Sequence, residues 1–155
     1  MWRAQTCLFI QLGLALLLAL TGCGGNGLPP ASSVTVTVTP SSATIAANGS
    51  VTLQGTASGF APQPDVAPPL MLWGIQESSN TVPVSACGLL PSQTPDLTLC
   101  PYGYVVQADV TSLPSNAVYH APATPGTYHV VFTATQSVMY SSLQKAAAAT
   151  ITVTP

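Results

Sequence analysis

The chain has 155 residues, of which 47% are hydrophobic and only 4% charged, and its formal net charge is −2. Two basic side chains cannot supply the clustered Lys and Arg that bind nucleic acid or acidic lipid headgroups, so both kinds of partner are excluded. The length fits a single domain, in which Thr, Ser, Asn and Gln must provide most of the polar surface.

The N-terminus has the parts of a secretory signal peptide. Arg3 precedes an apolar run, Cys7–Leu20, that only Gln11 interrupts, and small residues follow the run. As a helix these 14 residues would span about 21 Å, short of the ~30 Å hydrocarbon core of a membrane, which disfavours a spanning anchor. A soluble signal peptide that is cut elsewhere is the other alternative.

Leu20-Thr21-Gly22-Cys23 resembles the lipobox of bacterial lipoproteins. The resemblance implies diacylglycerol on the Cys23 thiol, cleavage before Cys23 and often an acyl chain such as palmitate on the new amine, which together give stable membrane attachment. Gly24 stands where an aspartate often marks retention in the inner membrane, so the resemblance favours the outer membrane in a bacterium with two membranes. We therefore predict a signal peptide over 1–22, and a lipidated Cys23 with a flexible tether over 23–33.

Short stretches of alternating apolar and hydroxyl side chains dominate the rest of the chain, which is typical of half-buried β-strands. Turn signals separate them, among them Pro40, Asn48-Gly49 and Pro125-Gly126. The predicted strands are Ser33–Thr39, a short edge segment at Thr44–Ala47, Val51–Ala57, Leu70–Gln76, a short one at Thr81–Val84, Tyr104–Val110, Ala117–His120, Thr127–Thr135 and Ala146–Thr154.

No segment after the signal peptide has a convincing 3.6-residue period, and the Ala146–Ala149 run, a good helix former, leads into Ile-Thr-Val-Thr, which favours a strand. Seven or so short strands in about 120 residues predict an all-β fold, a β-sandwich. The expected core is Val36, Leu53, Trp73, Tyr128, Val130, Phe132 and Ile151.

Several short motifs, in this order, resemble bacterial immunoglobulin-like domains of the second group. They are Val36–Thr44 leading into Ala47-Asn48-Gly49, Leu72-Trp73-Gly74-Ile75, the Tyr-x-Ala-Pro turn at Val118–Pro122, and the closing strand Ala149–Pro155. The resemblance covers about 34–155 and implies an immunoglobulin-like sandwich of about seven strands that serves as a spacer or adhesion module and has no shared catalytic residues. The chain departs from the pattern at about 77–116, a longer, proline-rich segment that we interpret as an insertion.

The inserted segment holds Cys87 and Cys100, the two cysteines that remain once Cys7 is cleaved off and Cys23 is lipidated. Export places them in an oxidising compartment, so we predict a disulfide that closes a loop of about 14 residues and pins the insert, not the core. A metal site is the alternative, but no Cys-x-x-Cys or His-x-x-x-His spacing supports it.

Candidate chemistry is sparse. His120 and His129 flank one turn with Asp109 nearby, and a metal site is the alternative there; we expect instead that both face solvent, because Tyr119 and Tyr128 take the inward positions. The four carboxylates are scattered, and no Gly-x-Ser-x-Gly elbow is present. We therefore predict no enzymatic activity, no metal and no cofactor.

Tyr102 and Tyr104 lie beside Cys100 and predict a contact patch for a sugar or a protein, unless they fold back over the edge of the sandwich. The segment Ser85–Gln107 is therefore the expected binding surface. The predicted function is a non-enzymatic, lipid-anchored cell-envelope protein with a structural or adhesive module. Two alternatives remain open: an accessory lipoprotein that docks onto an envelope or secretion complex, and a carbohydrate-binding surface protein.

Overall fold

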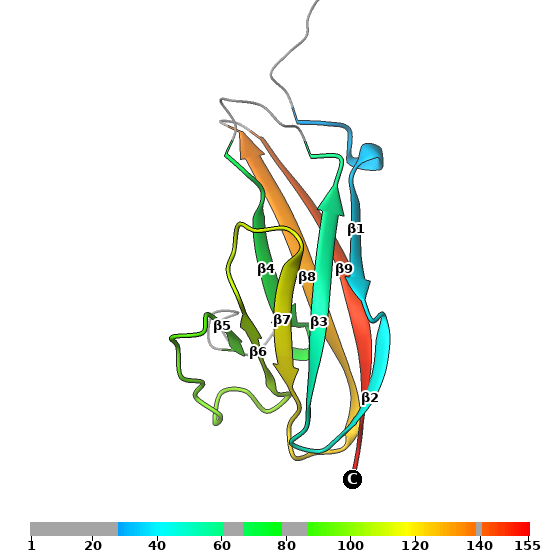
Figure 1. Cartoon of the computed structure of the whole chain (residues 1–155), viewed down its shortest axis with the longest axis vertical. Coiled ribbons are helices and arrows are strands. Elements are labelled where there is room, and N and C mark those ends of the chain that lie inside the picture. Colours follow the sequence, from blue (N-terminus) through cyan, green and yellow to red (C-terminus); the bar gives the residue numbers. More distant parts are fainter. Residues whose placement is uncertain (1–27, 61–66, 79–86, 139–140) are drawn as a thin grey trace, which may run out of the picture.

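The computed structural model of the chain describes residues 28–60, 67–78, 87–138 and 141–155 (Figure 1). The signal peptide, the lipidation site and the strand predicted at Thr81–Val84 lie outside these residues. Two short 3₁₀ turns are present, η1 (Ala31–Ser33) and η2 (Gln76–Ser78). The strands are β1 (Thr35–Thr39), β2 (Ser42–Ala46), β3 (Ser50–Ser58), β4 (Leu70–Ile75), β5 (Gly88–Leu89), β6 (Tyr104–Gln107), β7 (Ser115–His120), β8 (Gly126–Val138) and β9 (Ser141–Thr154).

These strands form two sheets that pack face to face. One sheet has the order β1-β3-β7-β6-β5 and the other the order β2-β9-β8-β4. The fold is an immunoglobulin-like β-sandwich, as the sequence predicted. The described part of the chain has nine strands; β2 corresponds to the short edge segment predicted at Thr44–Ala47, and the two-residue β5 was not predicted.

The first two strands belong to different sheets. β1 is antiparallel to β3, whereas β2 is parallel to β9. Pro40 separates them, and since proline has no N–H to give to a sheet, the chain leaves the first sheet there and joins the second. Each of the two sheets therefore has one edge formed by the N-terminal part of the chain.

The core follows the alternation that the sequence displays. Buried and exposed positions alternate along β3, β4, β8 and β9, and the buried side chains of the two sheets meet between them. Six of the seven expected core residues are buried, and the seventh, Val36, is partly buried and packs against the core.

The last two strands are longer than the sequence predicted. They form one continuous antiparallel ladder that begins at the pair Gly126–Val153 and extends to Val138–Ser141. Every alanine of the Ala146–Ala149 run pairs with a residue of β8, so sheet pairing overrides the helix propensity of that run.

The segment at 77–116 is not wholly an insertion outside the sandwich. Its strand β6 pairs with β7, and its strand β5 pairs with β6, so the segment supplies two strands of the five-stranded sheet. The loop between them, residues 90–103, is the part that projects from the sheet (Figure 1). The predicted strand Tyr104–Val110 ends at Gln107.

Trp73 links the two sheets. Its ring packs on Phe132 with ring centroids 4.8 Å apart, and its indole N–H donates a hydrogen bond of 2.9 Å to the Ser115 hydroxyl on the opposite sheet. The backbone N–H of Trp73 donates to the Gln107 side-chain carbonyl, also on the opposite sheet, at 2.9 Å. Because the backbone N–H of Met71 donates to the Val110 carbonyl, two donors on the free edge of β4 are occupied, which hinders pairing with another strand.

Gly55 provides the space for Phe132. A Cβ atom at Gly55 would lie 2.6 Å from atoms of the Phe132 ring. Gly55 is on β3 and Phe132 on β8, so the missing side chain lets the two sheets approach at the centre of the core. Glycine normally weakens a strand, and here close packing across the sandwich accounts for it.

Tyr128 closes the turn between β7 and β8. Its hydroxyl donates a 2.8 Å hydrogen bond to the Thr124 carbonyl, four residues upstream. The same arrangement, a tyrosine at the corner between two strands that bonds back to the preceding turn, is a feature of many immunoglobulin-like sandwiches. Among the described residues, no helix is long and apolar enough to cross a membrane.

We expect Gly55→Ala to lower the free energy of unfolding by about 1–3 kcal/mol, because the added methyl group must displace the Phe132 ring in a packed core. Thr52→Ala is the matched control, since Thr52 lies on the same strand with its side chain exposed and should change stability by less than about 0.5 kcal/mol. Urea unfolding of the purified chain measures both. A Gly55→Ala variant as stable as the wild type would contradict this description of the core.

Candidate functional site

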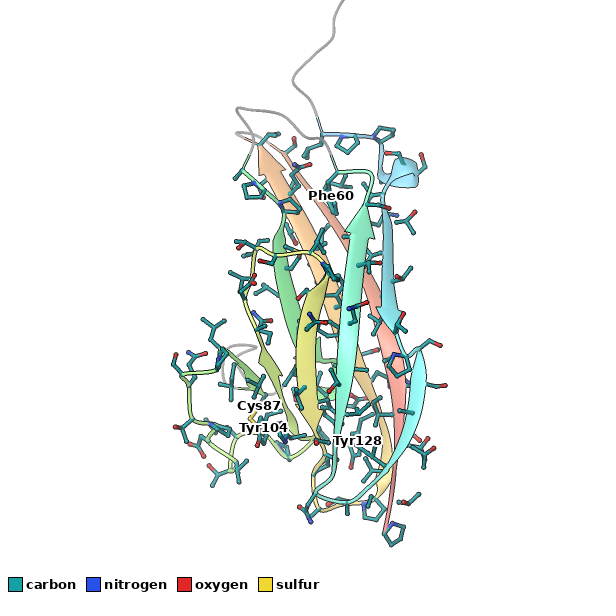
Figure 2. The ribbon with its side chains drawn as sticks, viewed as in Figure 1. Phe60, Cys87, Tyr104 and Tyr128 are labelled. Atoms are coloured by element: carbon teal, nitrogen blue, oxygen red, sulfur yellow. A yellow bond between two sulfur atoms is a disulfide. The ribbon has the colours of Figure 1, made fainter. Side chains whose placement is uncertain are left out.

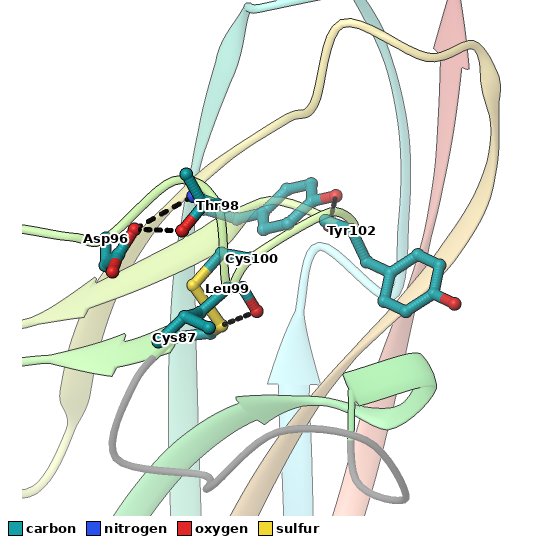
Figure 3. Close-up of a disulfide and its surroundings, with 7 residues drawn as sticks. Cys87, Asp96, Thr98, Leu99, Cys100 and Tyr102 are labelled. Carbon is teal, nitrogen blue, oxygen red and sulfur yellow. Dashed lines mark hydrogen bonds between the residues drawn. A yellow bond between two sulfur atoms is a disulfide. The ribbon is translucent and has the colours of Figure 1, made fainter.

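Cys87 and Cys100 form a disulfide with a Cα–Cα distance of 5.6 Å, which confirms the predicted pairing (Figure 3). Both cysteines are buried, and the Cys87 sulfur lies 3.4 Å from the Leu99 carbonyl oxygen. The disulfide adjoins β5 and β6 at the edge of the five-stranded sheet and does not connect the two sheets. It therefore closes a loop over residues 87–100, as expected, and leaves the contact between the sheets to packing and hydrogen bonds.

Hydrogen bonds hold the closed loop in shape. The Asp96 carboxylate accepts bonds from the backbone N–H and the hydroxyl of Thr98, at 3.0 and 2.6 Å (Figure 3). These bonds lower the pKa of Asp96, because they stabilise its ionised form. Gly103 adopts a left-handed backbone with φ +89°, and its N–H donates to the Cys100 carbonyl at 3.0 Å. A side chain at Gly103 would collide with the His120 carbonyl, so only glycine fits this turn.

The two tyrosines of the predicted contact patch lie in different environments. Tyr102 is half-buried and folds back onto the core, with its ring 6.3 Å from that of Tyr128. Its carbonyl accepts a 2.8 Å hydrogen bond from the Tyr119 hydroxyl. Burial raises the pKa of Tyr119, so this hydroxyl remains a donor at neutral pH. The alternative prediction, that the tyrosines fold back over the sandwich, is therefore correct for Tyr102.

Tyr104 lies on the outer face of the five-stranded sheet. It is the first residue of β6, paired in register with His120 of β7. The two rings stack with their centroids 4.6 Å apart and an interplanar angle of 12°. The inward positions beside them belong to Val105 and Tyr119, which are fully buried, so the period of the strands turns Tyr104 and His120 outward.

A cleft of about 540 Å³ lies beside this stacked pair. Its walls come from three segments that are far apart in the sequence: the β2–β3 turn, the end of the disulfide loop, and the β7–β8 turn. Figure 2 labels Tyr104 and Tyr128 near the end of the sandwich where these turns gather. The lining residues are Asn48, Leu97, Cys100, Pro101, Gly103, Tyr104, His120, Ala121, Pro122, Ala123 and Thr124.

The cleft carries no Asp, Glu, Lys or Arg among its lining residues. In the described part of the chain, no three His, Cys, Asp or Glu side chains lie close enough together to hold a metal ion. The Asp109 carboxylate accepts bonds from the backbone N–H groups of Thr111 and Ser112, and these lower its pKa. The structure therefore does not bring Asp109 together with the two histidines.

His129 instead pairs with Glu77, a contact that the sequence analysis missed. Its ring Nδ1 lies 2.7 Å from the Glu77 Oε1, and its backbone N–H donates to the same carboxylate at 3.1 Å. Partial burial raises the pKa of Glu77, but the hydrogen bonds from His129 outweigh it and leave the pKa below its ordinary value. The pairing of Ile75 with Val130 brings Glu77 and His129 together. The sequence does not reveal this strand register, so the contact could not be predicted from it.

A second hollow, of about 520 Å³, lies on the outer face of β4 and β8. Leu72, Gly74 and Val131 line it, and Leu70 and Leu72 on this face are 43% and 40% exposed. Ser78 and Cys87, which flank residues outside the described part of the chain, also belong to its lining.

Comparisons with known proteins do not assign the chain to a family. No family model matches the chain, and no curated protein matches it. Among solved structures, the chain is similar to domain 1 of VCBP3 from Branchiostoma floridae, with 16% identity and a TM-score of 0.46. The match covers 83% of this chain and 98% of the VCBP3 chain. An identity this low says nothing about a shared ligand or partner.

We expect a double variant, Cys87→Ser with Cys100→Ser, to lose about 2–4 kcal/mol of unfolding free energy, because the disulfide mainly constrains the unfolded chain. Amide exchange should rise in residues 88–103, while the buried amides of β3 and β8 keep their relative protection. A thiol assay that finds both cysteines free in protein isolated from cells would refute the pairing.

We expect Glu77→Gln to destabilise the chain by roughly 1 kcal/mol or less at pH 7, since the partly exposed pair is screened by water. The folded pKa of Glu77 is depressed, so its contribution is fully present above the unfolded pKa of about 4.3 and is lost as the pH falls through the folded pKa. Unfolding of both proteins between pH 7 and pH 3 measures the difference. A difference that does not change over this range would contradict the assignment.

Proposed function

We propose that the chain is a non-enzymatic, lipid-anchored module of the bacterial cell envelope with a structural or adhesive role. The Leu20-Thr21-Gly22-Cys23 motif supports the anchor, and the order of the short motifs between residues 34 and 155 supports a bacterial immunoglobulin-like domain of the second group. The signal peptide over 1–22, the tether over 23–33 and the domain over 34–155 belong to the same proposal.

The observation that carries the proposal is the placement of the cleft relative to the tether. The described chain enters at the end of the sandwich where Phe60 lies, and Tyr104 lies towards the opposite end (Figure 2). Strand β8 has 13 residues, and at about 3.4 Å per residue it spans roughly 44 Å between the two ends. With the tether at one end of the sandwich, the cleft can extend up to about 40 Å beyond the attachment point, where a partner can reach it.

The titratable groups support a role without catalysis. Glu77 is paired with His129, and the Asp96 and Asp109 carboxylates accept hydrogen bonds from their own loops. An active site needs a nucleophile, a base or an oxyanion donor that converge on one point, and the described groups lie in separate places. Binding is therefore the role that the cleft fits best.

The outer face of β4 favours a second role, an accessory lipoprotein that docks onto an envelope complex. The exposed leucines Leu70 and Leu72 and the neighbouring Val131 make this face apolar. Cross-linking in intact cells separates the two roles: recovery of one stoichiometric envelope complex supports docking, whereas attachment to cells or matrix without such a complex supports adhesion.

We expect Cys23→Ser to abolish incorporation of labelled palmitate and to leave an unprocessed or soluble chain, because lipid transfer needs the Cys23 thiol. Cys7→Ser is the matched control, since Cys7 lies inside the predicted signal peptide and should leave labelling and membrane attachment unchanged. Metabolic labelling followed by membrane fractionation measures both. A wild-type mature chain without lipid would refute the anchor.

A further inference from the structure

We propose that the cleft beside Tyr104 and His120 binds a neutral glycan segment. This inference rests on the proposed function as a surface binding module and names the class of ligand. It assigns recognition to the residues of three turns that line the cleft: Asn48, then Leu97, Cys100, Pro101, Gly103 and Tyr104, and His120–Thr124. Tyr102 is packed against the core and is not part of the site.

The stacked rings supply the first requirement for a sugar. Tyr104 and His120 cover one face of each other, and the parts of both rings that stay exposed are available to a ligand. Both rings are half-buried and both line the cleft. The apolar C–H face of a pyranose packs on such a ring, while hydroxyl groups at the sugar's edge remain free for hydrogen bonds.

Polar groups at the rim supply the second requirement. Asn48 has a left-handed backbone with φ 58°, a conformation that asparagine tolerates well, and its exposed side chain lies at the cleft. Its backbone N–H donates to the Pro122 carbonyl at 3.1 Å, which fixes the turn against the opposite wall. An amide offers a carbonyl acceptor and an NH₂ donor, the pair of groups that suits vicinal sugar hydroxyls.

The charge of the cleft selects among ligands. None of its lining residues is Asp, Glu, Lys or Arg, so His120 is the one basic side chain of the lining that could face a uronic acid, a phosphorylated sugar or a charged peptide. A volume of about 540 Å³ lies within the roughly 300–1,000 Å³ of common small-ligand clefts. Rings, an amide and the scarcity of charge together fit a short neutral oligosaccharide better than a polyanion or a peptide with charged side chains.

The walls are rigid before any ligand arrives. The Tyr119 hydroxyl holds the Tyr102 carbonyl, and the Ala121 N–H donates to the Gly49 carbonyl at 2.9 Å. The disulfide between Cys87 and Cys100 fixes the third segment. A site assembled in advance loses little conformational entropy on binding, which compensates for the modest number of polar contacts.

The test uses the full chain, purified in detergent, on an array of neutral oligosaccharides, acidic oligosaccharides and proline-rich peptides. We expect retention on a subset of neutral glycans. For the retained glycan, Tyr104→Ala should weaken binding at least about tenfold because the stacking surface is lost, and Tyr104→Phe should stay within about threefold because the ring remains.

Two further variants keep the result interpretable. Asn48→Gly removes the amide while retaining a residue that favours the left-handed backbone, and should weaken binding about three- to tenfold. Leu113→Ala, at an exposed residue of the β6–β7 loop outside the cleft, is the control and should bind as the wild type does. Thermal unfolding of each variant shows whether it is folded, and titration of labelled chain with the glycan should shift the amide signals of Gly103 and Asn48.

The proposal is overturned if acidic glycans or proline-rich peptides are retained in place of neutral glycans, if nothing is retained, or if folded Tyr104→Ala and Asn48→Gly chains bind as the wild type does. These outcomes are independent of the anchor, since the Cys23→Ser chain should bind the glycan with unchanged affinity. A wild-type chain that binds the glycan but carries no lipid would leave this inference standing and refute the anchor alone.

Discussion

The contacts of Trp73 determine how the two sheets lie on each other. Its ring packs on Phe132 within one sheet, while its indole and backbone N–H groups both donate to side chains of the other, Ser115 and Gln107. In antibody domains a disulfide joins the sheets beside the equivalent tryptophan. Here the single disulfide of the described residues lies within one sheet and its loop, so directional hydrogen bonds and the space over Gly55 fix the distance between the layers.

The cleft depends on that packing through two tyrosines. Tyr119 and Tyr128 lie on the inner faces of the two sheets, and each uses its hydroxyl to hold a turn at the same end of the sandwich. Their rings belong to the core, whereas the carbonyl groups that they bind, of Tyr102 and Thr124, belong to the segments around the cleft. A change in the core would therefore reach the cleft through two hydrogen bonds.

The sequence predicted the fold well because its strands alternate so regularly. Valine and threonine of β1, and alanine and isoleucine of β9, show by their order alone which face is buried. Gln107 and Ser115 could not be placed, because a polar side chain in a proline-rich stretch is usually exposed, and only the partner on the facing sheet explains their burial. The pairing of Glu77 with His129 and the stacking of Tyr104 on His120 likewise depend on strand register, which period-two patterns leave open.

The change of sheet at Pro40 has a mechanical consequence. β1 and β2 run in the same direction as β9, which ends at the opposite end of the sandwich from the start of the described chain (Figure 1). A pull between the N-terminal and C-terminal ends of the described chain would drag β2 along the axis of β9, so all five paired positions would bear the force together in shear and would not open one after another. A sandwich with this connection resists a force that pulls the two ends of the described chain apart along its long axis.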